Sequence, residues 1–342
     1  MKKPTDAKLI PATTPAMTRR SALGGLALGG AGLMGAPLTA HSTSHATAHS
    51  ANQSKPDDFE WTLDLDSAAD NCLAVIKMQA DTTGADALGG FPGEAWAWVP
   101  DVGNYHVFNT YGVGVSHVEF SEKENGWRFF HRECLLYTDK DTGEVVDSWY
   151  NPFTERRVEV MHVFNDHVSR FYPLSGGRFS FPWDYEIHGN NITFRISVFR
   201  VEENPLTRAE YPLHSEGDVY QTGELWGIMG DLREIMDPEV TSASCVTSWS
   251  RIAGWLPFME MGNRPGQMIM HSHAYKMKGG AAELPPKIRT YIEKNAPEYL
   301  ESPTEWTPPG QRVTVFNHSK KVIDERRPNL KEGETPFGWR GE

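Results

Sequence analysis

Residues 191–201 read NITFRISVFRV, and this stretch decides the fold class. Apolar and polar side chains alternate along it, which is typical of a β-strand with one buried face. Stretches rich in aromatic and β-branched residues follow the same tendency at 105–120, 126–139, 156–168 and 266–277. The chain is therefore predicted to be mainly β: an antiparallel barrel-like or bent-sandwich domain with a few short helices.

Turns and helices fill the space between these stretches. DTGE at 141–144 and HGNNIT at 188–193 are typical of hairpin turns. Residues 65–81 have helical spacing and predict a short helix that runs into a strand. Residues 285–302 predict a second helix with proline at its start. Residues 227–239 fit either a third helix or a strand followed by a turn.

The N-terminus has the features of an export signal. Arg19 and Arg20 precede a weakly apolar run from Ala22 to Leu38, and Ala46 and Ala48 suit signal cleavage. Residues 1–48 are thus predicted to be a twin-arginine signal peptide, bound by the twin-arginine translocase during export. The run is too short and too rich in glycine for a stable membrane anchor. We therefore expect a periplasmic or secreted protein.

The rest of the chain divides into a linker and a domain. Residues 49–58 are predicted to be a disordered linker, and residues 59–342 a single β-rich domain. The leader carries five of the 33 Lys and Arg and one of the 45 Asp and Glu, so the remainder has 28 against 44. This acidic balance excludes nucleic acid as an expected partner. The three cysteines fit no disulfide framework and no metal-binding spacing.

The sequence GQMIMHSHAYKM at 266–277 places His271 and His273 two residues apart in an apolar run. On a strand, both side chains point to the same face. Three interpretations are open: a metal site completed by His162, His131 or Glu186, an acid–base pair in a pocket, or a hydrogen-bonded pair in the core. Metal is not favoured, because no further ligand motif follows, and the cofactor is unknown. The absence of a dinucleotide or Walker motif predicts no nucleotide cofactor.

The expected pocket combines this pair with residues of other strands. Arg251 lies between Trp249 and Ile252 and suits binding of an anionic oxygen, or else a salt bridge to Glu260 or Asp184. The predicted catalytic residues are His271, His273, Arg251, His162 and Tyr137. The predicted ligand-binding residues are Trp249, Trp255, Tyr275 and Met270.

Two segments carry a family resemblance. These are TSWSRIAGWLPFMEMGNRPGQMIMHSHAYKMKGGAAELPPKI at 247–288 and DTGEVVDSWYNPFTERRVEVMHVFNDHV at 141–168. They resemble a bacterial and fungal family of unknown function, domain family 1838, over most of the chain after the leader. The resemblance implies a β-rich, barrel-like domain and assigns no catalytic residue. The family's Trp–Leu–Pro–Trp–Met reads Trp–Leu–Pro–Phe–Met here, with Phe258 in place of the second tryptophan.

Three functions remain from the sequence. The first is an enzyme that acts on a small apolar or aromatic molecule by His, Tyr and Arg acid–base chemistry. The second is a non-catalytic periplasmic carrier of a small hydrophobic ligand. The third is a structural protein with a filled barrel. All eleven tryptophans follow the leader, and large aromatic side chains suit either a pocket or a filled interior.

Overall fold

The computed structural model of the chain describes residues 59–166, 168–176, 180–308 and 315–341. The predicted signal peptide at 1–48 and linker at 49–58 lie outside these residues. Within the described ranges, no helix has the length and apolar character needed to span a membrane. The three cysteines are free thiols.

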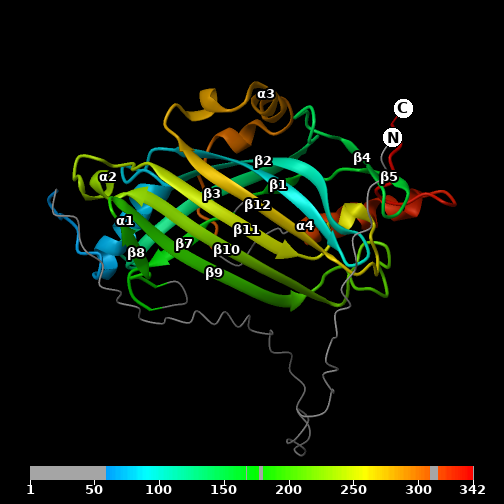
Figure 1. Cartoon of the computed structure of the whole chain (residues 1–342), viewed down its shortest axis with the longest axis horizontal. Helices are drawn as coiled ribbons and strands as arrows, with labels where there is room; N and C mark the ends of the chain where they lie inside the picture. Colours follow the sequence, from blue (N-terminus) through cyan, green and yellow to red (C-terminus); the bar gives the residue numbers. More distant parts are fainter. Residues whose placement is uncertain (1–58, 167, 177–179, 309–314, 342) are drawn as a thin grey trace, which may run out of the picture. The chain divides into compact units, whose positions relative to one another are not determined.

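Ten strands form one antiparallel sheet in the order β6-β3-β2-β1-β12-β11-β10-β9-β8, with β7 also paired to β3 (Figure 1). The strands are β1 (Ala87–Val99), β2 (Gly103–Ser121), β3 (Gly126–Thr138), β6 (Val163–Asn165), β7 (Arg170–Pro173), β8 (Tyr185–His188), β9 (Asn191–Glu203), β10 (Val219–Asp231), β11 (Cys245–Ala253) and β12 (Gln267–Met277). A separate hairpin pairs β4 (Ser148–Asn151) with β5 (Arg156–Glu159). Among the described strands, the two sheet edges do not pair with each other, so the sheet is not closed.

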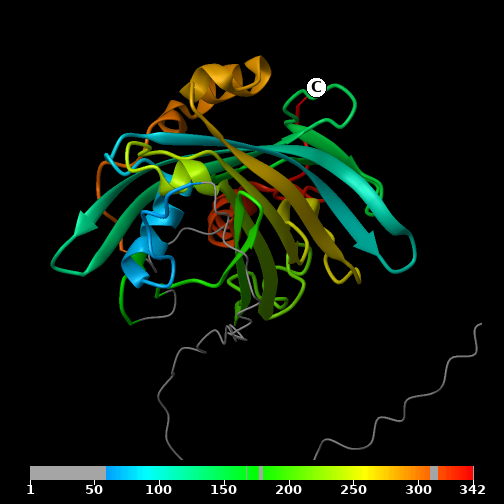
Figure 2. The same cartoon turned by 60° about the vertical axis from the view of Figure 1, so that its left-hand side comes forward.

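The long strands curve, which gives the sheet a concave inner face and a convex outer face (Figure 2). Side chains alternate between these faces along each strand. Met268 and Met270 of β12 mark the inner face, where they join a large buried cluster with Ala95 of β1. Leu88 and Val113 mark the outer face, where they join a different cluster.

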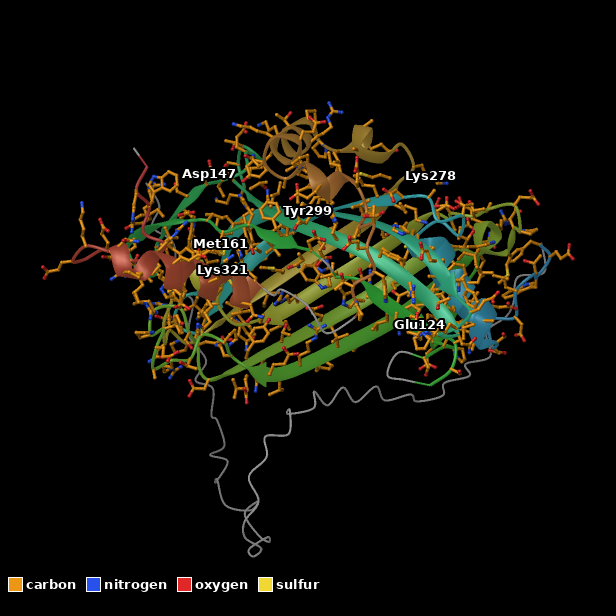
Figure 3. All side chains as sticks on the ribbon, turned by 180° about the vertical axis from the view of Figure 1, so that it is seen from behind. Glu124, Asp147, Met161, Lys278, Tyr299 and Lys321 are labelled. Atoms are coloured by element: carbon orange, nitrogen blue, oxygen red, sulfur yellow. The ribbon has the colours of Figure 1, made fainter. Side chains whose placement is uncertain are left out.

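Helices cover parts of both faces. The helices are α1 (Ala68–Gln79), α2 (Leu232–Met236), α3 (Pro286–Asn295) and α4 (Val315–Arg326), and the short 3-10 turns are η1 (Pro257–Met259), η2 (Gly280–Glu283), η3 (Pro297–Leu300) and η4 (Arg327–Asn329). Helix α1 packs on the inner face near one end of the sheet, and α4 packs through Phe316 near the other. Figure 3 shows α4, which carries Lys321, from behind. Helix α3 packs through Ile288 and Ile292 on the outer face.

A half-buried lysine joins α1 to the sheet. Lys276 of β12 points inward and donates to the carbonyl oxygens of Lys77 and Ala80, at 2.7 and 2.8 Å. These carbonyls lie at the C-terminal end of α1, where helix carbonyls lack intrahelical partners. The ammonium group thus satisfies the helix end and complements its dipole.

The predicted mainly β, antiparallel fold with a few short helices is confirmed, as an open ten-stranded sheet, together with the β8–β9 hairpin and the helices at 65–81 and 285–302. The predicted change from helix to strand within 65–81 is wrong, because the helix continues to Gln79 and the next strand starts at Ala87. Strand β1 and helix α4 were not predicted. Strand β1 is rich in Gly and Ala, which have low β-propensity, and long-range pairing with β2 and β12 supplies its stability.

Candidate binding site on the inner face

His271 and His273 lie on the outer face of β12, and both are exposed. They share a face, as predicted, and their ring centroids are 4.8 Å apart. Nδ1 of His271 is 2.7 Å from Oγ of Ser250 on β11. The prediction that the pair points into a pocket with Trp249, Arg251 and one of His162 or Tyr137 is wrong, because the adjacent Met268 and Met270 take the inner face. Tyr275, predicted to bind ligand, also lies on the outer face and is 48 % exposed.

The inner face instead carries four of the other predicted residues, Tyr137, Trp249, Arg251 and Met270, in two adjacent cross-strand rows. The first row is Tyr137, Thr110, Gly93, Ser272, Trp249 and Trp226. The second row is Phe108, Ala95, Met270, Arg251 and Glu224. Residues paired across antiparallel strands point to the same face. Residues of strands β3 to β10 along the sheet order therefore place side chains on the same inner face.

Four polar atoms in these rows are buried and have no hydrogen-bond partner among the described residues. They are the hydroxyl of Tyr137, Nε1 of Trp249, Nε of Arg251 and Oγ of Ser272. We call these four residues the donor set. A buried polar group without a partner costs about 1–3 kcal/mol, so four on one face of the sheet require an explanation.

Arg251 is held by two residues of β10 that the sequence analysis did not select. Its Nη2 donates to the hydroxyl of Tyr220, and its Nε lies 3.9 Å from Oε1 of Glu224. Burial acts to lower the pKa of Arg251, but its interactions with Tyr220 and Glu224 outweigh burial and raise the pKa. Among the described residues, Glu224 is the carboxylate within 4.0 Å of Arg251, whereas the expected partner Glu260 contacts Arg156 at 3.6 Å.

Tyr137 is completely buried among aromatic rings. Its ring centroid is 5.1 Å from that of Phe108 and 5.7 Å from that of Phe258. Burial raises the pKa of its hydroxyl far above the usual value, while the positive charge of Arg251 acts in the opposite direction. The hydroxyl therefore stays neutral at ordinary pH and is available as a hydrogen-bond donor.

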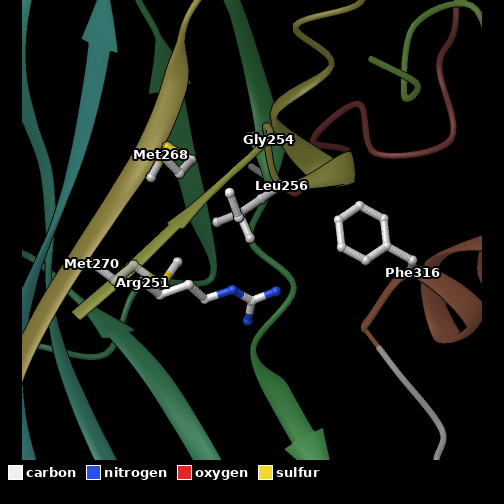
Figure 4. A pocket seen from close by; sticks show the side chains of 7 residues that line it. Arg251, Gly254, Leu256, Met268, Met270 and Phe316 are labelled. Carbon is white, nitrogen blue, oxygen red and sulfur yellow. The ribbon is translucent and has the colours of Figure 1, made fainter. Parts of the chain in front are cut away.

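A small cavity lies directly beside Arg251 (Figure 4). Its volume is about 10 Å³, and it is lined by Arg251, Ala253, Gly254, Leu256, Met268, Met270 and Phe316. This is about the space that one water molecule needs. Beyond it, Phe91, Trp226 and Trp249 of the inner face are only half-buried. Of the donor set, Arg251 lines the cavity, and Trp249 belongs to the half-buried aromatic surface.

His162 lies beside Tyr137, with ring centroids 6.0 Å apart, and its Nε2 is buried and has no hydrogen-bond partner among the described residues. Its Nδ1 accepts a hydrogen bond from the backbone N–H of Tyr137 at 3.1 Å, so the neutral ring carries its proton on Nε2. Its ring lies against Tyr291 of α3, with centroids 5.5 Å apart. Burial lowers the pKa of His162 to about 4.

Because burial lowers the pKa of His162, we expect the folded protein to lose stability as the pH falls. The unfolded chain binds a proton at His162 near pH 6.5, whereas the folded chain does so only near pH 4. Stability should therefore fall as the pH falls from 6.5 to 4, by up to about 3 kcal/mol from this residue. His131 and His214 have lowered pKa values through burial and act in the same direction.

The test is urea unfolding across this pH range for His162→Gln, which keeps an acceptor for the Tyr137 N–H but does not titrate. The variant should show a shallower dependence than the parent. His188→Gln, at a residue with 74 % of its side chain exposed, is the matched control and should leave the slope unchanged. Equal slopes for the parent and His162→Gln would contradict the prediction.

The residues proposed for a metal site do not meet. His271 and His273 are on the outer face, His162 is at the β3 edge, and Glu186 of β8 pairs with Arg195 at 2.8 Å. His131 donates through Nδ1 to the carbonyl of Val115 at 3.0 Å. In the part of the chain that the structure describes, no group of three or more His, Cys, Asp or Glu side chains is arranged to hold a metal ion.

Of the remaining predicted residues, Met270 lines the cavity, and Trp255 is buried near it with Nε1 donating to the carbonyl of Arg264.

Tyr220, Glu224 and Trp226 were not predicted from the sequence. They occupy even-numbered positions of VYQTGELWGIMGD at 219–231. Residues two or four positions apart on a strand point to the same face, so this spacing would have placed the three side chains together.

The chain matches the model of a family described as proteins of unknown function, DUF1838, over residues 87–322. A comparison with curated proteins finds no match. The matched segment covers β1 to β12, and with them both inner-face rows. The resemblance predicted from the two sequence segments is confirmed, and the chain belongs to the DUF1838 family of proteins of unknown function.

Proposed function

We propose that the inner face binds a small, largely apolar molecule through an oxygen atom that accepts hydrogen bonds. The observation that carries this proposal is the donor set: four unpartnered buried polar atoms in two adjacent rows. Buried polar groups are normally paired, and a bound ligand is one way to pair them. Two of the four residues, Arg251 and Trp249, come from the same strand.

The chemistry of the donor set defines the ligand group. Arg and Trp side chains donate but never accept, and the neutral Tyr137 hydroxyl and the Ser272 hydroxyl can both donate. A ligand that supplied only donors would leave Arg251 and Trp249 unsatisfied. An oxygen with free lone pairs, such as a carbonyl or a carboxylate oxygen, complements the set.

The surroundings favour an apolar body for the same ligand. Met268, Met270 and Phe316 form the wall beside Arg251. The rings of Trp226 and Trp249 lie next to each other, with centroids 5.8 Å apart, and both are half-buried. Small-molecule sites are typically lined by apolar and aromatic side chains with a few polar groups that fix orientation.

A second candidate function is proton transfer to the bound oxygen. Tyr137 and Arg251 belong to adjacent rows of the inner face, and the positive charge of Arg251 acts to lower the pKa of Tyr137, opposite to the effect of burial. A neutral hydroxyl near a guanidinium group suits donation of a proton to a developing oxyanion. A Tyr137→Phe variant separates the two candidates: a carrier loses part of its affinity, whereas an enzyme retains binding but loses turnover.

The proposal is tested by native mass spectrometry of the full chain purified from its own host. The expected result is a retained small molecule that denaturation releases and that Arg251→Met no longer retains. A parent protein that carries no retained molecule and binds no aromatic carbonyl compound would favour the third interpretation, a filled interior.

We further propose that the protein acts outside the cytoplasm. Replacing Arg19 and Arg20 by Lys is expected to leave the precursor in the cytoplasm, because the translocase recognises the arginine pair before the apolar run. Cell fractionation and immunoblotting of the parent and the double variant measure this. Replacing Lys2 and Lys3 by Arg, which keeps the charge outside the pair, is the control. Normal export of the Arg19 and Arg20 variant would refute the signal.

A further inference from the structure

The donor set is accompanied by one acidic residue that restricts the charge of the ligand. Glu224 of β10 is the cross-strand partner of Arg251, and its Oε1 lies 3.9 Å from Nε of Arg251. Only 17 % of its side chain is exposed, and that of Arg251 is 25 % exposed. The guanidinium charge is thus already matched by a nearby carboxylate in a region that water screens only partly.

The position of a bound oxygen follows from this geometry. An oxygen that accepts from Nε of Arg251 lies about 3 Å from that nitrogen. Because Glu224 Oε1 is 3.9 Å from the same nitrogen, the ligand oxygen and the Glu224 oxygen are within about 7 Å of each other. At this separation two negative charges repel appreciably in a partly buried site.

We infer that the ligand of the inner face is uncharged and offers a carbonyl-type oxygen, and that Glu224 is the specificity-determining residue that disfavours carboxylates. This inference rests on the proposed binding function. The neutral Tyr137 hydroxyl and the donors of Trp249 and Ser272 add no charge to the site. Arg200 of β9 is a further cation on the inner face and lies opposite Thr222, one row beyond Glu224.

The experiment compares two probes of nearly equal shape, methyl 2-naphthoate and 2-naphthoate, at neutral pH. Dissociation constants are measured by quenching of tryptophan fluorescence, since Trp226 and Trp249 border the site. The parent should bind the ester at least tenfold more tightly than the carboxylate. Glu224→Gln should reduce this preference by about tenfold, mainly by improving binding of the carboxylate.

Glu203→Gln is the matched control, because Glu203 is exposed at the end of β9 and its replacement changes the net charge equally. It should leave the ester-to-carboxylate ratio unchanged. The parent ratio alone already tests the inference if Glu224→Gln does not fold.

The outcomes separate the two proposals. Equal or tighter binding of the carboxylate by the parent overturns the neutral-ligand inference while leaving a binding site in place. A parent preference for the ester that persists in Glu224→Gln overturns the role of Glu224. Failure of both probes to bind, or binding that Arg251→Met does not alter, overturns the proposed function and the inference with it.

Discussion

Replacing Arg251 by Met is expected to weaken binding of methyl 2-naphthoate by about 100-fold, measured by tryptophan fluorescence quenching. The variant removes the charged donor of the set, and loss of a charge-assisted hydrogen bond costs about 1.5–3 kcal/mol, or roughly ten- to 150-fold in affinity. It also leaves Glu224 without the cation that lies 3.9 Å away in the parent. A bare carboxylate near the ligand oxygen adds to the loss.

Two further variants make this result specific. Arg251→Lys keeps the positive charge but lacks the planar guanidinium group, whose several N–H groups can donate to Tyr220 and to the ligand at the same time. This variant should therefore also lose most of the affinity. Arg195→Met is the matched control, because Arg195 is exposed on the outer face. Circular dichroism and thermal melting establish that each variant folds. An unchanged dissociation constant for folded Arg251→Met would refute the site.

The strands were predictable because alternation is a local property of the sequence. NITFRISVFRV at 191–201 forms β9 within two residues of its expected end. Helix α3 was predictable from its proline start and apolar spacing. The order of the strands in the sheet was not predictable, because the pairing of β1 with β12 joins residues nearly 180 positions apart, such as Glu94 and His271. No local pattern encodes such a pairing.

The residues of the candidate site were also only partly predictable from the sequence. The two-residue spacing of His271 and His273 fixes their common face but not which face it is. In GQMIMHSHAYKM the alternate set with Met268 and Met270 is more apolar and takes the interior. Comparing the two sets would have placed the histidines outside. Arg251 was found because it lies between Trp249 and Ile252, and Tyr137 because it follows Leu135 and Leu136 on its strand. The sheet brings Arg251, Trp249 and Tyr137 to one face.

Among the substitutions considered, truncation of Phe258, which packs against Tyr137, is expected to have the largest effect on stability. Phe258 of η1 is 1 % exposed, and its ring centroid is 5.7 Å from that of Tyr137 and 6.4 Å from that of Phe108. Phe258→Ala is expected to lower the free energy of unfolding by about 3–5 kcal/mol, because it removes buried apolar surface and leaves a cavity between closely packed rings. Urea unfolding measures the change.

The matched control is Phe199→Ala on the outer face of β9, where the same truncation removes a side chain that is already 50 % exposed. It should cost less than about 1 kcal/mol, since little of its surface is buried on folding. Phe258→Ala should also weaken ligand binding, because Tyr137 loses a neighbour that fixes the direction of its hydroxyl. A similar loss of stability in both variants would mean that the region around Tyr137 is loosely packed, and would remove the rigid wall on which the proposed site depends.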